Sequence, residues 1–176
     1  MIGTAGAIQQ VLRRRHIRFW LLAACALCFL DQLVKYFAVS YLTYGVAYPV
    51  MPGFNLTLLH NTGAAFSLLD DQSGWQRWFL SCITIAVSIG IVFWIAFIDS
   101  SERWVLLALS LILGGALGNL TDRVSLGHVV DFIQIYYDRW FWPAFNVADA
   151  AICVGAVMLI LRGPRSRQAQ RGTGSV

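Results

Sequence analysis

Charged side chains are scarce in this chain. Only 12% of its 176 residues are charged, whereas 58% are hydrophobic and the mean hydropathy is +0.64. Water-soluble domains do not usually reach this hydropathy, so the composition predicts a membrane protein and argues against an ordinary soluble fold. A chain of this length has room for a few helices and their connections, and we expect one integral membrane domain over residues 1–176.

Cysteine and histidine are also few. The four cysteines all lie inside apolar runs, at Cys25, Cys28, Cys82 and Cys153. A thiol in such a run behaves as a small hydrophobe, and no second Cys or His pair completes a zinc site. Cys25 and Cys28 form a CxxC pair, but it lies in an expected lipid-level helix without a thioredoxin-like context. The sequence therefore predicts no disulfide, no metal and no cofactor.

Acidic residues are outnumbered by basic ones, which gives a net charge of +4. This excess does not indicate a nucleic-acid partner, because four of the 13 basic residues precede Phe19 and four follow Leu161. Arginines at such positions commonly fix the orientation of a membrane protein, with the arginine-rich side in the cytoplasm. Both ends of the chain are therefore expected in the cytoplasm, and the polar tail over 163–176 is expected to be disordered there.

Long apolar runs are abundant. A helix needs about 20 apolar residues to cross a bilayer. Four candidate spans cover residues 19–39, 78–98, 104–120 and 147–161. The connections 40–77 and 121–146 contain few arginines, so both are expected on the outer side of the membrane.

The two outer connections contain short strand-forming segments. Residues 54–58 and 129–137 contain β-branched and aromatic side chains, which favour strands. We expect a small sheet lying on the outer leaflet, with an aromatic belt at the depth of the lipid headgroups. The tryptophans expected in this belt are Trp75, Trp78, Trp140 and Trp142.

A few charged residues interrupt the apolar runs. Asp31 and Lys35 are four residues apart with the acid on the amino side, which is the favourable order for an ion pair within a helix. A charge deep in a bilayer costs about 2.5 to 3.5 kcal/mol on insertion scales, so such residues usually face the interior of a bundle. We interpret this pair as a structural tie between the first helix and the others. Asp122 and Arg123 are interpreted as a cap and anchor just beyond the third span.

Asp131 and Asp149 lack such a structural explanation. Asp131 lies among apolar residues, and Asp149 is three residues after Asn146 and therefore on the same helix face. Two carboxylates that meet at one membrane depth can share a proton and act together as acid and base, as in an aspartic peptidase. A Ser–Lys peptidase fits less well, because Asp31 keeps Lys35 charged.

Two other classes of function stay open at this point. A transporter would also carry charges inside the membrane, but it needs polar groups through the whole thickness, and the cytoplasmic half has almost none. A non-enzymatic scaffold would need only arginine anchors and helix packing, such as the GxxxG motif of Gly114 and Gly118. That reading leaves Asp131 and Asp149 unexplained.

Four motifs stand out along the chain. They read DQLVK at 31–35, NTGAAFS at 61–67, GGALGNLTDRVSLGHVVDF at 114–132 and FNVADA at 145–150. In this order and spacing they resemble the lipoprotein signal peptidases, or signal peptidase II, of bacterial inner membranes. The resemblance covers most of the chain and implies an all-α membrane protein with four transmembrane helices, a small periplasmic β-cradle and a short periplasmic helix.

The resemblance also implies a function and a set of site residues. The catalytic residues would be Asp131 and Asp149, and the substrate would be a prolipoprotein whose signal peptide is cut on the amino side of a diacylglyceryl-modified cysteine. The enzyme would act as a monomer among membrane lipids, near the periplasmic face of the inner membrane and with both termini cytoplasmic. Positions expected to bind substrate or support the site are Asp31, Lys35, Asn61, Gly63, Gly118, Asn119, Asp122, Arg123 and Asn146.

Overall fold

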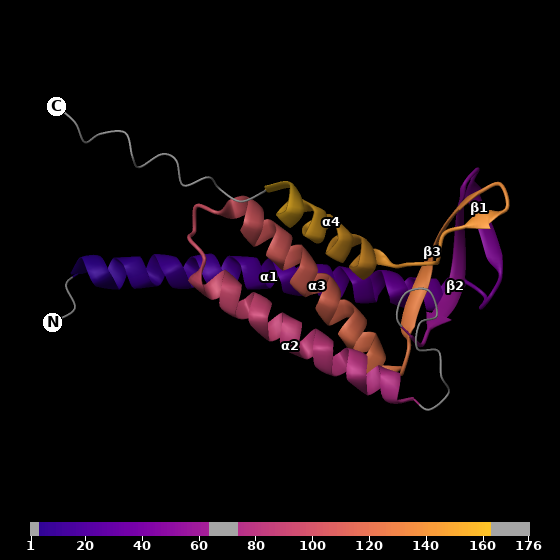
Figure 1. The fold of residues 1–176 in the computed structure, drawn as a ribbon, viewed down its shortest axis with the longest axis horizontal. Helices are drawn as coiled ribbons and strands as arrows, with labels where there is room; N and C mark the ends of the chain where they lie inside the picture. The colour runs from indigo at the N-terminus through magenta and orange to yellow at the C-terminus, as the bar shows by residue number, and fades with distance from the viewer. Residues whose placement is uncertain (1–3, 64–73, 163–176) are drawn as a thin grey trace.

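The structure is a computed structural model that describes residues 4–63 and 74–162. The described residues are mostly helical and carry a small antiparallel sheet at one end of a helix bundle (Figure 1). The helices are α1 (Thr4–Tyr41), α2 (Trp75–Phe97), α3 (Arg103–Ser125) and α4 (Val147–Arg162). The strands are β1 (Ala47–Met51), β2 (Phe54–Asn61), β3 (Val129–Tyr137) and β4 (Trp140–Phe141).

Among the described residues, three helices are long and apolar enough to cross a membrane. These segments are Arg15–Tyr41, Trp75–Phe97 and Arg103–Ser125. The fourth expected span is also helical, but α4 has only 16 residues, fewer than the roughly 20 that a bilayer requires. The membrane character of the chain is therefore supported by its helices, and the fourth crossing stays a prediction.

Two helices extend beyond the apolar runs from which they were predicted. The helix expected from residue 19 begins at Thr4, since polar and basic residues such as Gln and Arg are good helix formers outside a membrane as well. The helix expected to end at residue 120 continues to Ser125 and ends before Gly127, whose φ of +85° suits the left-handed residue after a helix. Asp122 and Arg123 therefore lie in the last turns of α3, and not beyond the helix as expected.

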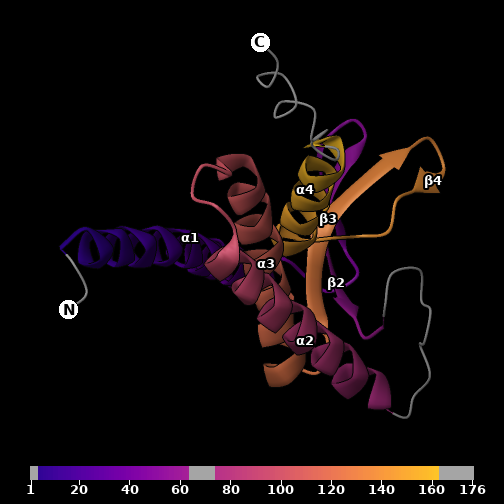
Figure 2. The same cartoon turned by 60° about the vertical axis from the view of Figure 1, so that its left-hand side comes forward.

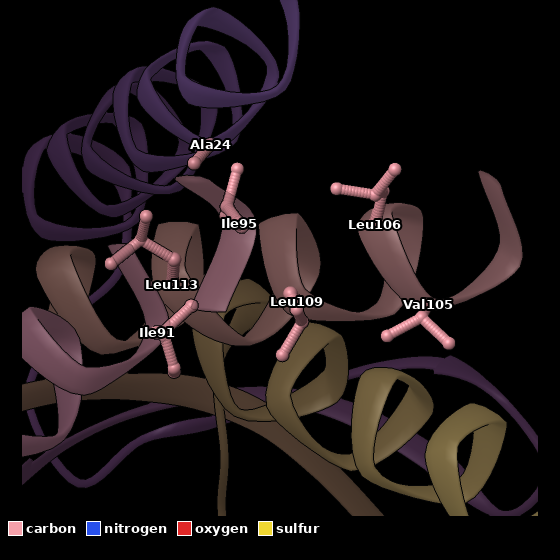
Figure 3. Packing of buried hydrophobic residues seen from close by; sticks show 7 residues of the cluster. All are labelled: Ala24, Ile91, Ile95, Val105, Leu106, Leu109 and Leu113. Atoms are coloured by element: carbon pink, nitrogen blue, oxygen red, sulfur yellow. The ribbon is translucent and has the colours of Figure 1, made fainter. Parts of the chain in front are cut away.

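α3 is the central helix of the bundle and packs closely against α1. A Cβ atom at Gly114 would lie 2.6 Å from the carbonyl oxygen of Ala24, so only glycine permits this approach. Close backbone packing through small residues is a common way for membrane helices to associate, because lipid provides no hydrophobic driving force between them. Around this contact, apolar side chains of α1, α2 and α3 form the hydrophobic core, among them Ala24, Ile95 and Leu109 (Figure 3).

The sheet has the order β1-β2-β3-β4, with neighbouring strands antiparallel. It lies at the end of the bundle where α1 and α3 end and where α2 and α4 begin, and the β3–β4 hairpin projects away from the helices (Figures 1 and 2). The small sheet expected from the sequence is thus confirmed. A bulge in β2 between Leu56 and Leu59 brings Leu59 opposite Asp131 and Asn61 opposite Val129.

Some expectations fall outside the described residues. The tail over 163–176 and the second half of the NTGAAFS motif, residues 64–67, belong to this group. The described parts of the two outer connections, 42–63 and 126–146, contain no helix. The short periplasmic helix implied by the resemblance is therefore not found there, and residues 64–73 are not described.

Candidate active site

A buried ion cluster lies where α1 and α3 meet near the sheet. The Lys35 ammonium is 2.8 Å from Oδ2 of Asp31 and 2.8 Å from Oδ2 of Asp122. All three side chains are at most 3% exposed. The Asp31–Lys35 pair expected from the sequence is present, but Asp122 joins it and does more than cap a helix. Pairing is what makes such charges tolerable in a buried site, since isolation in a low dielectric is costly.

The cluster also holds the main chain of two neighbouring elements. Oδ1 of Asp31 accepts the N–H of Ala148 in the first turn of α4 at 2.8 Å. Oδ2 of Asp122 accepts the N–H of Val130 in β3 at 3.1 Å. Each carboxylate therefore fixes the residue that immediately precedes one of the two candidate catalytic aspartates.

Asn119 connects the ion cluster to Asp149. Its side-chain carbonyl accepts a hydrogen bond from Lys35 Nζ at 3.0 Å, and its amide Nδ2 donates to Asp149 Oδ1 at 2.7 Å. An amide can accept on one end and donate on the other, which this position between a cation and a carboxylate requires. Asn119 is 5% exposed, so its bond to Lys35 is buried, whereas its bond to the half-buried Asp149 is partly buried.

Asn146 contacts both aspartates. Its amide Nδ2 donates to Asp131 Oδ1 at 2.7 Å, and its carbonyl Oδ1 accepts the main-chain N–H of Asp149 at 2.9 Å. The Asp149 carboxylate accepts the main-chain N–H of Asn146 at 3.3 Å in return. This reciprocal arrangement is a capping box at the start of α4, formed by Asn and Asp in place of the usual Ser or Thr and Glu. Asn146 thus immediately precedes α4, whose first residue is the one expected for the span 147–161.

Asp131 is held from the opposite side by the sheet. Asn61 Nδ2 donates to its Oδ2 at 3.1 Å, and the N–H of Gly63 donates to Asn61 Oδ1 at 3.2 Å, which fixes the orientation of the Asn61 amide. Asp131 is 2% exposed. Burial, and after it the negative charge of Asp149, raise the pKa of Asp131 from 3.8 to about 7, against the opposing effect of its hydrogen bonds to Asn61 and Asn146.

The remaining expected positions lie around this network. A Cβ atom at Gly118 would be 2.6 Å from Oδ2 of Asp31, so the missing side chain makes room for that carboxylate. Arg123 is half-buried and donates to the carbonyl of Asn119 at 3.5 Å, and its charge attracts Asp149 and Asp131. Every expected site residue therefore belongs to one connected region.

One participant was missed from the sequence. Gln32 Nε2 donates to Oδ1 of Asp122 at 2.8 Å and to the carbonyl of Gly118 at 3.1 Å. A signal was available, because a polar amide within an apolar helix is costly to expose to lipid, and Gln32 directly follows Asp31. Within the described residues, no group of three or more His, Cys, Asp or Glu side chains is arranged to hold a metal ion.

This geometry is suited to acid and base chemistry. Two electrostatically coupled carboxylates titrate as a pair and retain one proton over a wide pH range. The protonated member can donate to a carbonyl oxygen while the ionised member accepts a proton from water. The site can therefore support hydrolysis of an amide bond.

Comparisons with known proteins agree with this chemistry. A family model described as signal peptidase (SPase) II matches residues 23–163. A lipoprotein signal peptidase of Polynucleobacter necessarius is 52% identical over 141 residues, which are 80% of this chain and 86% of the relative. A lipoprotein signal peptidase of Pseudomonas aeruginosa is 49% identical over 158 residues, or 87% of this chain and 94% of the relative.

Solved structures show the same relationship. A bacterial membrane enzyme determined by the in meso method at 2.3 Å resolution superimposes with a TM-score of 0.76 and 31% identity, over 90% of this chain and 94% of that chain. A second, at 1.9 Å resolution, gives a TM-score of 0.70 and 32% identity over 82% and 91%. The resemblance seen in the sequence motifs is thereby confirmed. The chain belongs to the signal peptidase II family and is a bacterial membrane peptidase that removes signal peptides from prolipoproteins.

Proposed function

We propose that this peptidase is an aspartic endopeptidase that cuts on the amino side of a diacylglyceryl-modified cysteine, with Asp131 and Asp149 activating one water molecule. The observation that carries the proposal is that one side chain, Asn146, contacts both aspartates. Its Nδ2 donates to the Asp131 carboxylate at 2.7 Å, and its Oδ1 accepts the main-chain N–H of Asp149 at 2.9 Å. The electrostatic repulsion between the two aspartates adds support, because it favours a dyad that shares one proton.

The two aspartates have different parts in the proposed reaction. Burial favours the protonated form of Asp149 as well. Its position in the first turn of α4 and its hydrogen bonds from Asn119 and the main-chain N–H of Asn146 oppose this effect, and we assign it as the base. Asp131, buried and with a pKa of about 7, acts as the acid. Attack transfers one water proton to Asp149, forms the carbon–oxygen bond and moves the Asp131 proton to the carbonyl oxygen. Asp149 then protonates the leaving nitrogen, the carbon–nitrogen bond breaks, and Asp131 recovers its proton from the diol intermediate.

The supporting residues act on this dyad from three directions. Asn61, oriented by Gly63, donates a hydrogen bond to Oδ2 of Asp131. Asn119 accepts a hydrogen bond from Lys35 and donates one to Asp149, so it links the buried cation to the proposed base. Gly118 leaves space for Asp31, and Arg123 adds a positive charge at the rim of the site. Asp122 and Asn146 fix the main chain on either side of the dyad.

The proposed position in the membrane follows from the apolar helices and the aromatic residues of the sheet end. We infer four crossings of the inner membrane by one domain that acts as a monomer, with both termini in the cytoplasm and the dyad near the periplasmic face. Trp75, Trp78, Trp140 and Trp142 are all exposed, which suits the headgroup region. A signal helix could then enter sideways from lipid, and neither its apolar residues nor the acyl chains would have to leave hydrocarbon.

The test compares purified wild-type protein with two variants, Asp131→Asn and Asp149→Asn, on a lipidated and an unlipidated precursor. Wild type is expected to cut only the lipidated precursor, and each variant to lose activity by about 10²- to 10⁴-fold, which is the typical contribution of general acid–base catalysis. Cleavage is read as a shift of the product on a gel. Asp138→Asn is the matched control, since Asp138 lies in the β3–β4 turn with φ +52°, which Asn also tolerates. A folded Asp149→Asn protein that still cleaves would exclude the proposal.

A further inference from the structure

The ion cluster acts on both halves of the dyad through the main chain. Asp31 holds the N–H of Ala148, next to Asp149, and Asp122 holds the N–H of Val130, next to Asp131. The separation of the two catalytic carboxylates therefore depends on the separation of Asp31 and Asp122. These two residues come from different helices, α1 and α3.

The cluster contains two negative charges and one positive charge. Lys35 lies between the carboxylates of Asp31 and Asp122, 2.8 Å from each, but its single positive charge balances only one of their two negative charges. Repulsion between buried carboxylates is strong, because the local dielectric is low. A neutral donor that reaches both helices would oppose their separation without adding charge.

Gln32 is placed to be this donor. Its Nε2 is 2.8 Å from Oδ1 of Asp122, 3.1 Å from the carbonyl of Gly118 and 3.4 Å from Oδ2 of Asp31. The first two contacts join α1 to two successive turns of α3, and the third adds the carboxylate of its own helix. Charge-assisted bonds of this kind are stronger than bonds between neutral groups.

We infer that Gln32 is a positioning residue of the peptidase, which sets the distance between Asp131 and Asp149 by tying Asp31 and Asp122 together. The inference rests on the proposed role of the two aspartates as the catalytic pair. Without the amide, the carboxylates of the cluster relax apart, and the main-chain segments that they hold move with them. A misplacement of about 1 Å can cost about 100-fold in rate.

The test is the pH dependence of cleavage by Gln32→Met, which keeps the length of the side chain and removes its donors. We expect kcat to fall about 10- to 100-fold with KM for the lipidated precursor unchanged. The alkaline limb of the pH–rate profile is expected to move to lower pH, because a more distant Asp149 raises the pKa of Asp131 less. Gln32→Glu, which replaces donors by acceptors, should show a larger loss.

Gln134→Met is the matched control, because Gln134 is also half-buried and accepts a hydrogen bond from Thr57 at 2.9 Å outside the cluster. Its pH profile should coincide with that of wild type. Gln32→Asn retains the amide on a shorter side chain and should shift the alkaline limb of the pH–rate profile by an intermediate amount. It serves as the test if the Met variant does not fold. A folded Gln32 variant with a wild-type kcat and pH profile, whether or not its melting temperature falls, would overturn the inference.

The two proposals can fail separately. If Asp131→Asn and Asp149→Asn cleave normally, the assignment of the dyad is wrong whatever Gln32 does. If both are inactive while folded Gln32→Met behaves as wild type, the dyad stands and only the positioning role of Gln32 is wrong.

Discussion

Asp131 and Asp149 have the same side chain but different surroundings. Asp131 lies on β3 and is almost fully buried, with its hydrogen bonds supplied by the amides of Asn61 and Asn146. Asp149 is half-buried at the start of a helix, with a main-chain N–H among its donors. A helix N-terminus favours a carboxylate, whereas burial favours a carboxylic acid. These differences fit the proposed roles of Asp131 as the acid and Asp149 as the base.

The raised pKa of Asp131 predicts that cleavage slows as pH rises through about 7, because the proposed acid loses its proton.

The raised pKa of Asp131 also predicts how the stability of the folded protein depends on pH. Between pH 3.8, the ordinary value, and about 7, the folded state binds more protons at this residue than the unfolded state. This contribution to stability is therefore complete at low pH, is lost as pH rises, and is constant above about 7.

The measurement is the melting temperature of wild type and Asp131→Asn in detergent from pH 4 to pH 8. The difference between the two proteins should change across this interval and level off above pH 7, since the Asn side chain does not titrate. A difference that is independent of pH would show that Asp131 does not carry the raised pKa.

At the scale of the elements, α3 determines how closely the helices approach. Gly114 faces the backbone of α1, and Gly118 faces the carboxylate of Asp31 one turn further along. The same helix carries Asn119 and Asp122, so its packing face and its contribution to the site are continuous. A change in helix packing at this face is therefore also a change in the ion cluster.

Gly118→Ala should consequently impair both stability and cleavage. The added methyl group would lie 2.6 Å from Oδ2 of Asp31 and force this carboxylate away from Lys35 and from the N–H of Ala148. Overpacking of this kind costs about 1 to 3 kcal/mol, which corresponds to a lower melting temperature by several degrees. The loss of cleavage should exceed the loss expected from unfolding alone, measured as activity per folded protein.

Gly90→Ala in α2 is the control for that substitution. Apart from its chain neighbours and the adjacent backbone of α2, no atom lies within 4 Å of a Cβ placed there, so the change should leave cleavage intact. Alanine is also the better helix former by about 1 kcal/mol, and the melting temperature should be equal or slightly higher. Equal effects of the two substitutions would contradict the close approach of α3 to Asp31.

On the scale of the whole molecule, the two ends of the bundle differ in chemistry. The sheet end carries the polar network and exposed aromatic side chains. At the opposite end, Arg162 of α4 pairs with Glu102 just before α3, and Trp104 Nε1 donates to the carbonyl of Met158 at 2.8 Å. This asymmetry fits the proposed entry of the substrate from the leaflet at the sheet end.

The proposed orientation predicts which surface residues a membrane-impermeant maleimide can reach in spheroplasts. In a background with the four native cysteines replaced by alanine, Tyr137→Cys at the sheet end should be labelled directly. Ser101→Cys, between α2 and α3, should be labelled only after the membrane is permeabilised. Both positions are exposed, so a difference reports the side of the membrane. The reverse labelling pattern would invert the assigned orientation.

Hydropathy and local spacing determined much about this protein by themselves. They predicted a membrane protein, its long apolar helices and strands near residues 54–58 and 129–137, because these properties depend on residues close together in the chain. The motifs were enough to indicate the signal peptidase II family. The Asp31–Lys35 pair also followed from sequence, since residues four apart on a helix are neighbours in any fold.

The tertiary structure decided which distant groups meet. Gln32 and Asp122 are 90 residues apart, and Asp31 and Ala148 are 117 apart, so no periodic pattern relates them. The extension of α3 past residue 120 also escaped prediction, because Asp122 there gains its partners from α1 and β3 and not from its own helix. The sequence shows which polar and charged side chains would be costly in a membrane without a partner. Only the packing of one helix against another selects the partners that remove this cost.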